Sequence, residues 1–190
     1  MKMKAVRTVR MRRGVSQRDL ARRAGISFRG LQLLETPGHD PRVSSLDKLS
    51  GALGLPTGGI SALLDGFLLE DGRSFRSASV RILADGFDSW TIHLFDSVDA
   101  FRRERDSGLV RVGPVDELHP RLRALIASTV ETVCVELSIP SPGWCRGVES
   151  LDSPWFVAGI ENLKASALVE SPVRFRKRNI FVLANFLERA

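Results

Sequence analysis

The chain has 190 residues, a formal net charge of +6, 43% hydrophobic residues and two cysteines. This length allows one large domain or two small ones. No stretch of about eighteen apolar residues occurs and no apolar core follows the basic amino terminus, so we expect neither a membrane span nor a signal peptide, and a cytoplasmic location. Cys134 and Cys145 lack a Cys-x-x-Cys partner, which predicts reduced thiols and no metal site.

Positive charge is concentrated at the amino terminus. Residues 1–36 hold ten basic and two acidic side chains, a balance of +8, whereas residues 61–190 hold 16 basic and 18 acidic side chains, a balance of −2. Neutralisation of nucleic-acid phosphates requires such a local positive field. A solvated basic face without a partner would more often be spread along the chain.

Residues 16–25 have the pattern of a short capped helix. Ser16 can accept a hydrogen bond from a free N–H group of the first turn, and Asp19 completes a capping box. Gly25 is suited to the left-handed conformation that ends a helix. The predicted buried face consists of Leu20, Ala21 and Ala24.

A second short helix is predicted directly after the first. Ser27 caps it, and Leu31 and Leu34 recur at a spacing of three. The intervening turn, residues 24–26, is so short that the two helices must cross steeply, with one face of the second helix pointing outward. The first residues of that face can enter a DNA major groove.

The pattern Ser-Gln-x-x-Leu-Ala-x-x-x-Gly-Ile-Ser-x-x-x-Leu-x-x-x-Glu over residues 16–35 resembles the Cro and phage-repressor family of helix-turn-helix proteins, the xenobiotic-response-element type. The resemblance extends over residues 3–65: residues 6–15 resemble the family's first helix and loop, residues 41–55 its fourth helix and residues 60–64 its fifth. It implies an all-α, five-helix domain at residues 1–66 that binds double-stranded DNA. The alternative is a helical bundle that keeps this fold for protein contacts.

The resemblance also implies roles for single residues. Gln17 matches a residue that donates a hydrogen bond to a DNA phosphate, and Arg42 lies in the loop whose backbone runs along the other DNA strand. Arg10 and Glu35 match an internal ion pair of the family. Arg29 can contact a guanine, with roughly 1–3 kcal/mol of discrimination. The candidate DNA-binding residues are Gln17, Ser27, Phe28, Arg29, Gln32 and Arg42.

Three residues of the second helix depart from the family pattern. Phe28 and Leu33 are apolar where relatives carry polar residues, and Gly30 lies in the helix interior, where glycine is unfavourable by up to about 1 kcal/mol relative to alanine. Phe28 can pack on a thymine methyl group, or it can pack in the core. Arg29 and Gln32 are therefore the expected polar readers.

We place a linker at residues 67–74 and a second, α+β domain at residues 75–190. Alternation on both sides of Asp85-Gly86 predicts an antiparallel hairpin over residues 79–94, and residues 109–112 are a candidate third strand. Pro120 opens the longest helical pattern, which would cover this small sheet. Further helices are predicted from residue 153 and over residues 179–189.

The second domain carries no pattern typical of catalysis. Asp85, Asp88, Asp96 and Asp99 fit turns and helix caps, and the three histidines are scattered without the spacing of metal ligands. A glycine-rich phosphate loop is also absent from the sequence. We therefore expect no enzyme activity and no cofactor.

A second basic cluster follows Pro172. Arg174, Arg176, Lys177 and Arg178 can bind phosphates or an acidic protein surface, or can be a solvated face. The tail over residues 153–182 resembles that of small bacterial helix-turn-helix proteins encoded beside predicted nucleotidyltransferases, in what resemble toxin–antitoxin pairs.

These patterns together predict a sequence-specific transcription regulator. The expected form is a homodimeric repressor of antitoxin type that autoregulates its operon at an inverted-repeat operator, because one helix-turn-helix reads only half a site. The alternative is an interaction module that neutralises or senses a cognate toxin-like enzyme, or a small ligand, through its carboxy-terminal domain.

Overall fold

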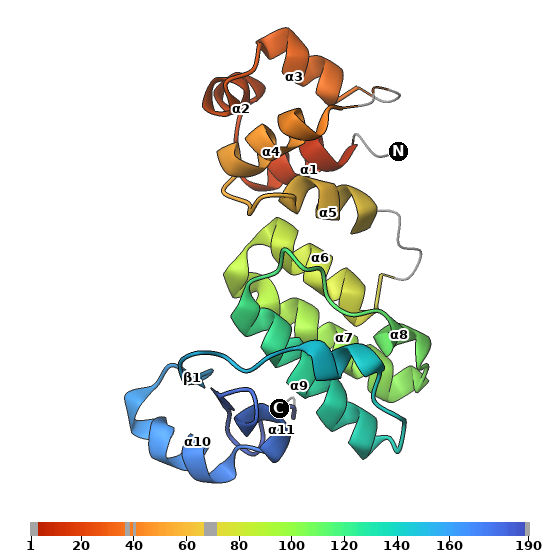
Figure 1. Cartoon of the computed structure of the whole chain (residues 1–190), viewed down its shortest axis with the longest axis vertical. Helices are drawn as coiled ribbons and strands as arrows, with labels where there is room; N and C mark the ends of the chain where they lie inside the picture. Colours follow the sequence, from red (N-terminus) through yellow and green to blue (C-terminus); the bar gives the residue numbers. More distant parts are fainter. Residues whose placement is uncertain (1–3, 37–38, 40, 67–71, 189–190) are drawn as a thin grey trace.

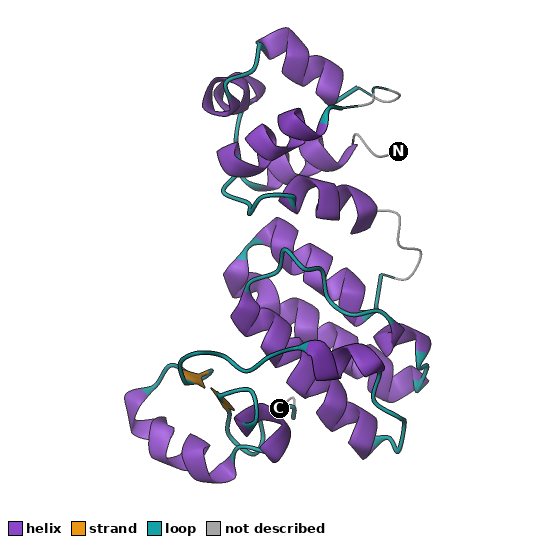
Figure 2. Cartoon of the chain, in the orientation of Figure 1, coloured by secondary structure: helices purple, strands orange, loops and turns teal. Residues whose placement is uncertain are grey.

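The computed structural model describes residues 4–36, 39, 41–66 and 72–188. Most of the described chain is helical, and the two short strands lie near the carboxy terminus (Figure 2). Figure 1 shows α2 and α3 at one end of the molecule and α10 at the other, with α5 and α6 packed together between them. The predicted fold class, a five-helix domain followed by helices with a small sheet, is confirmed in this outline.

The amino-terminal domain has the five expected helices. Their apolar faces meet in one core, where Val6, Leu20, Leu31, Leu49 and Leu63 are fully buried. The helices are α1 (Lys4–Arg12), α2 (Gln17–Ala24), α3 (Phe28–Leu34), α4 (Val43–Ala52) and α5 (Gly59–Gly66).

The second half is built around three longer helices. α6 packs on α7 and α7 packs on α9, and the Phe75 and Phe101 rings meet edge to face at 6.3 Å between the first two. The expected helix at Pro120 is confirmed, with the proline in its first turn. The elements of this bundle are α6 (Phe75–Asp85), η1 (Phe87–Ser89), α7 (Trp90–Glu104), α8 (Gly108–Arg111), α9 (Pro120–Glu136) and η2 (Gly143–Gly147).

The predicted hairpin over residues 79–94 is wrong, because both of its strands are helical. Ser74 accepts a hydrogen bond from the N–H of Ser77 and so caps α6, and Gly86 ends that helix at φ 104°. Asp85-Gly86 is therefore a helix end rather than a hairpin turn. α6 is buried on most sides, so it lacks the single apolar stripe that identifies a surface helix. Residues 109–112, the candidate third strand, lie largely in α8.

The sheet lies elsewhere and is parallel. β1 (Trp155–Phe156) pairs with β2 (Ile180–Phe181), and the Phe156 and Phe181 rings stack at 5.0 Å. The helix predicted from residue 153 begins later, after η3 (Glu161–Leu163), as α10 (Lys164–Glu170); α11 (Val173–Arg176) follows. The helix predicted over residues 179–189 is replaced by β2 and turns, and Arg189 lies outside the described residues.

The predicted linker falls mostly on residues that the structure does not describe, since 67–71 lie outside the described ranges. Its last residue, Ser74, is the cap of α6. The two halves are in contact: Arg12 of α1 forms an ion pair with Asp85 at 2.7 Å, and Arg13 donates hydrogen bonds to the carbonyl oxygens of Leu53 and Leu83. The division at residues 66 and 75 remains a prediction.

Candidate nucleic-acid interface

α2, the turn after it and α3 form a helix-turn-helix whose caps are set by local sequence. The Ser16 hydroxyl accepts a hydrogen bond from the Asp19 N–H at 3.1 Å, and Ser27 accepts one from the Gly30 N–H at 3.0 Å. Gly25 ends α2 at φ 62°, and its N–H donates to the last turn of that helix. The buried residues of both helices then face one core, which fixes their crossing and leaves the other face of α3 outward.

The outward face of α3 carries most of the predicted base readers. Phe28, Arg29 and Gln32 are exposed, as is Leu33. Phe28 is 40% exposed and lies under the Arg18 guanidinium, which is 5.9 Å from the ring centroid. The alternative of core packing for Phe28 therefore does not describe this structure.

The Glu35 carboxylate accepts hydrogen bonds from two side chains behind this face. Arg10 donates to both carboxylate oxygens of Glu35, at 2.6 and 3.1 Å, so the two residues form an ion pair. Gln17 donates its side-chain N–H to the same carboxylate at 2.6 Å. The Gln17 amide nitrogen carries two N–H groups, so a phosphate contact can use the second while the first donates to Glu35.

Ser27 and Arg42 share one hollow between α3 and α4. The hollow has a volume of about 420 Å³, and Leu33 and His39 also line it. Arg42 precedes α4, is exposed, and makes no side-chain capping hydrogen bond. His39 was missed by the sequence reasoning, although its place in the loop before Arg42 was a usable signal.

The positive charge of residues 1–36 is divided between surface and interior. Arg10, Arg12 and Arg13 contact protein groups in the helix-turn-helix domain or in α6. The remaining described arginines of α2 and α3, Arg18, Arg22, Arg23 and Arg29, are exposed. Arg18 adds positive charge beside the outward face of α3, where its guanidinium lies over Phe28, and it was not among the predicted contacts.

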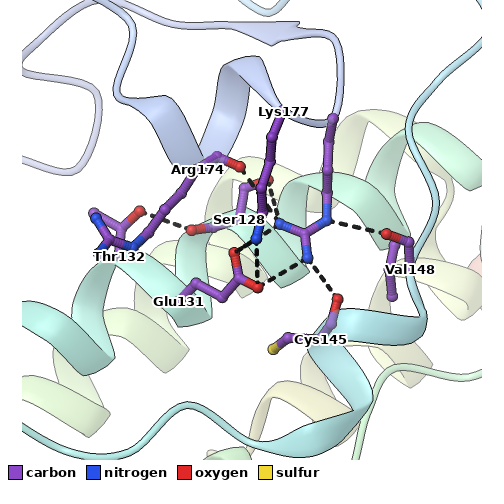
Figure 3. A network of polar contacts seen from close by, with 8 residues as sticks. Ser128, Glu131, Thr132, Cys145, Val148, Arg174 and Lys177 are labelled. Carbon is purple, nitrogen blue, oxygen red and sulfur yellow. Dashed lines mark hydrogen bonds and ion pairs between the residues drawn. The ribbon is translucent and has the colours of Figure 1, made fainter.

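The second basic cluster is partly used inside the protein (Figure 3). Arg178 is 2% exposed and donates to both carboxylate oxygens of Glu131, at 2.8 and 3.0 Å, and to the carbonyl oxygen of Cys145 at 2.5 Å. Lys177 donates to the same carboxylate at 2.9 Å. Arg178 is therefore not available as a partner-binding residue, which corrects the prediction; Arg174 and Arg176 remain candidates.

Glu131 is held in its charged form by these contacts. Burial by itself would raise the pKa of the Glu131 carboxyl, but the hydrogen bonds and charges of Arg178 and Lys177 outweigh burial and lower that pKa below its ordinary value. The network fastens α11 and the following residues to α9 and η2.

Residues that could bind a metal ion are dispersed over the described parts of the chain. Among residues 4–36, 39, 41–66 and 72–188, no group of three or more His, Cys, Asp or Glu residues could hold a metal ion. Cys134 and Cys145 are both buried and free, and burial raises the pKa of the Cys145 thiol to about 12. No described helix is long and apolar enough to cross a membrane.

Comparison with known proteins gives the same assignment for the first third of the chain. Residues 6–60 match the helix-turn-helix family. No curated protein and no solved structure matches the chain. The capped α2–α3 pair and this match define a helix-turn-helix domain in this part of the chain. It is the kind of domain with which transcription regulators bind double-stranded DNA.

Proposed function

We propose that this protein is a sequence-specific transcription regulator, a dimeric repressor of antitoxin type that represses its own operon. The observation that carries the proposal is the exposed face of α3, which bears Phe28, Arg29 and Gln32, with the Arg18 guanidinium over the Phe28 ring. This face lies at the end of the molecule remote from α10, so the carboxy-terminal half leaves it open (Figure 1). We expect the protein to act in the cytoplasm, without catalysis or a cofactor of its own.

The contacts fall into two classes with different consequences. We expect the exposed side chains of Arg18, Arg23 and Arg42 to contact phosphates, which set affinity and register. We expect the exposed side chains of Arg29 and Gln32 to contact base edges, which set sequence preference. A dimer reads two half-sites about one helical turn apart, which predicts an inverted repeat in the operator.

Binding to the DNA upstream of its own gene tests this function. Fluorescence anisotropy should give a dissociation constant in the nanomolar range for a fragment with an inverted repeat, and a steep loss of affinity with rising salt. Light scattering should give about twice the 21.0 kDa mass of the chain. Affinity no better than for random DNA would contradict the proposal.

A second candidate function, binding of a toxin-like partner, is favoured by the exposed surface of α10 and α11. Val169 is 81% exposed and Val173 is 61% exposed, next to Arg174 and Arg176. Apolar side chains rimmed by charge are typical of protein interfaces. Co-expression with the neighbouring gene product should yield a stable complex. A complex without any operator binding by the full chain would favour this function over the first.

A further inference from the structure

Leu33 is a large apolar side chain on the outward face of α3 that the core does not use. It is 47% exposed, whereas Leu31 and Leu34 of the same helix are buried. It follows Arg29 by four residues, so the two side chains lie on one face of the helix, about one turn apart. When this face enters a major groove, Leu33 leaves water, and the group that it then contacts affects the affinity.

The hollow between α3 and α4, about 420 Å³ in volume, is open beside Leu33. Its apolar lining consists of Ile26, Leu33 and Leu34. Gly30, about one turn before Leu33, also lines the hollow, and a β-carbon there would lie 2.9 Å from the Ser27 hydroxyl oxygen. Because glycine has no side chain, a group from outside has room to reach the apolar lining.

Basic side chains line the same hollow. Arg42 and His39 are both exposed, and none of the described residues that line the hollow is acidic. Ser27 and Ser45 add two hydroxyl groups. Basic and hydroxyl side chains are typical contacts of DNA phosphates. The hollow therefore combines side chains suited to an apolar group with side chains suited to a phosphate, and a nucleotide can present both.

The groups that bases present in the major groove decide which base suits Leu33. Adenine, guanine and cytosine present hydrogen-bond donors and acceptors there, and thymine alone adds an apolar group, the methyl at C5. A polar group that faces a leucine side chain loses water without gaining a partner, which is unfavourable. Contact with the methyl group removes apolar surface of both partners from water, which is favourable. An apolar residue at this position therefore selects thymine.

We propose that Leu33, with the hollow beside it, contacts the C5-methyl group of one thymine in each operator half-site, a preference that rests on the proposed function. A helical turn rises about 5.4 Å and stacked bases are about 3.4 Å apart. On a helix that lies along the groove, this thymine is therefore one or two base pairs from the base that Arg29 contacts. Leu33 sets sequence preference beside Arg29, and Arg42 contacts a neighbouring phosphate.

Replacement of single thymines by uracil in one operator half-site tests this contact. Uracil still pairs with adenine and differs from thymine only by the missing methyl group. Fluorescence anisotropy with the full chain should find a position at which uracil weakens binding about threefold to tenfold, as expected for the loss of one buried methyl contact. Uracil at a thymine outside the half-sites is the matched control and should leave the affinity unchanged.

Variants of the two apolar residues on this face assign the methyl contact to a side chain. Leu33→Ala should weaken binding to the unmodified operator, and uracil at the sensitive position should then have no further effect, because the contact is already lost. Leu33→Met keeps an apolar side chain and should retain most of the uracil effect. Phe28→Ala should retain all of it at that position. Ile92→Ala, at an exposed residue of α7, should bind both DNAs as the parent does.

The outcomes separate this proposal from the proposed function. Specific operator binding without any uracil-sensitive thymine overturns the Leu33 contact and leaves the proposed function standing. A uracil effect that persists in Leu33→Ala, or that disappears in Phe28→Ala, also overturns it. Affinity for the operator no better than for random DNA overturns both. The uracil substitutions are made in the DNA, so a negative result cannot come from a misfolded variant.

Discussion

The arginines of α2 and α3 lie in surroundings opposite to those of Arg178, which follows α11. Arg18, Arg23 and Arg29 are exposed, on α2 and α3, whose sequences contain one acidic residue, Asp19. Arg178, in an equally basic stretch of sequence, is buried against Glu131 of α9. Basic residues that are close together in the sequence therefore do not by themselves define a binding surface. An acidic side chain on a packed neighbouring helix decides whether a cation faces outward.

The largest expected effect follows from removing the charge of Glu131, the carboxylate against which Arg178 is buried. Glu131→Gln leaves the Arg178 guanidinium without its ion pair and should lower the free energy of unfolding by about 3–5 kcal/mol. Urea unfolding measures this change. Arg176→Gln, on an exposed neighbour, should change it by less than about 0.5 kcal/mol. Equal effects of both substitutions would contradict the distinction.

The same ion pair predicts a pH dependence. Because the pKa of Glu131 is lower in the folded than in the unfolded protein, its contribution to stability is present above the ordinary value of 4.5 and is lost as the pH falls through the lower, folded value. The stability difference between the parent and Glu131→Gln should shrink on acidification through that range. A difference that grows at low pH would show that the sign is wrong.

A smaller effect is expected at the ion pair behind the DNA-binding face. Glu35→Gln replaces the acceptor of Arg10 and Gln17 and should lower the free energy of unfolding by about 1.5–3 kcal/mol. It should also free the Gln17 side chain. Thermal unfolding measures the first consequence and operator titration the second, and a stable variant would show that Glu35 does not organise this face.

Glycine-to-alanine substitutions should change the free energy of unfolding by still smaller amounts. The sign should differ between Gly25, in the turn between α2 and α3, and Gly51, a control position in α4. Gly25 has φ 62°, so Gly25→Ala should destabilise the domain by about 1–2 kcal/mol. Gly51 lies in α4 with open space at its β-carbon position, so Gly51→Ala should stabilise by up to about 1 kcal/mol. Thermal unfolding of the two variants checks the opposite signs; a shift of the same sign in both would count against the assigned turn.

The parts predictable from sequence are those fixed by neighbouring residues. Ser16, Gly25 and Ser27 set their helix ends through local hydrogen bonds and backbone preference, so spacing alone located α2 and α3. The sequence Asp85-Gly86, by contrast, is equally typical of a hairpin turn and of a helix end. Only the burial of α6 between α5 and α7, a long-range property, decides between them.

The candidate site shows the same limit. Local pattern placed Arg29 and Gln32 on the outward face of α3, where the structure has them. Local pattern could not identify Glu131 as the partner of Arg178, because the two residues are 47 positions apart in the chain. It also missed the pocket between the α4–α5 loop and the start of α9, whose walls are brought together by packing of the two halves.

The central claim is that the exposed face of α3 reads DNA sequence. The direct test is operator affinity of Arg29→Ala, measured by anisotropy beside Arg146→Ala, an exposed arginine remote from α3. Arg29→Ala should lose about 1–3 kcal/mol of binding free energy on the operator and much less on random DNA. Arg146→Ala should bind as the parent does. Unchanged operator affinity in Arg29→Ala, or an equal loss on both DNAs, would contradict the claim.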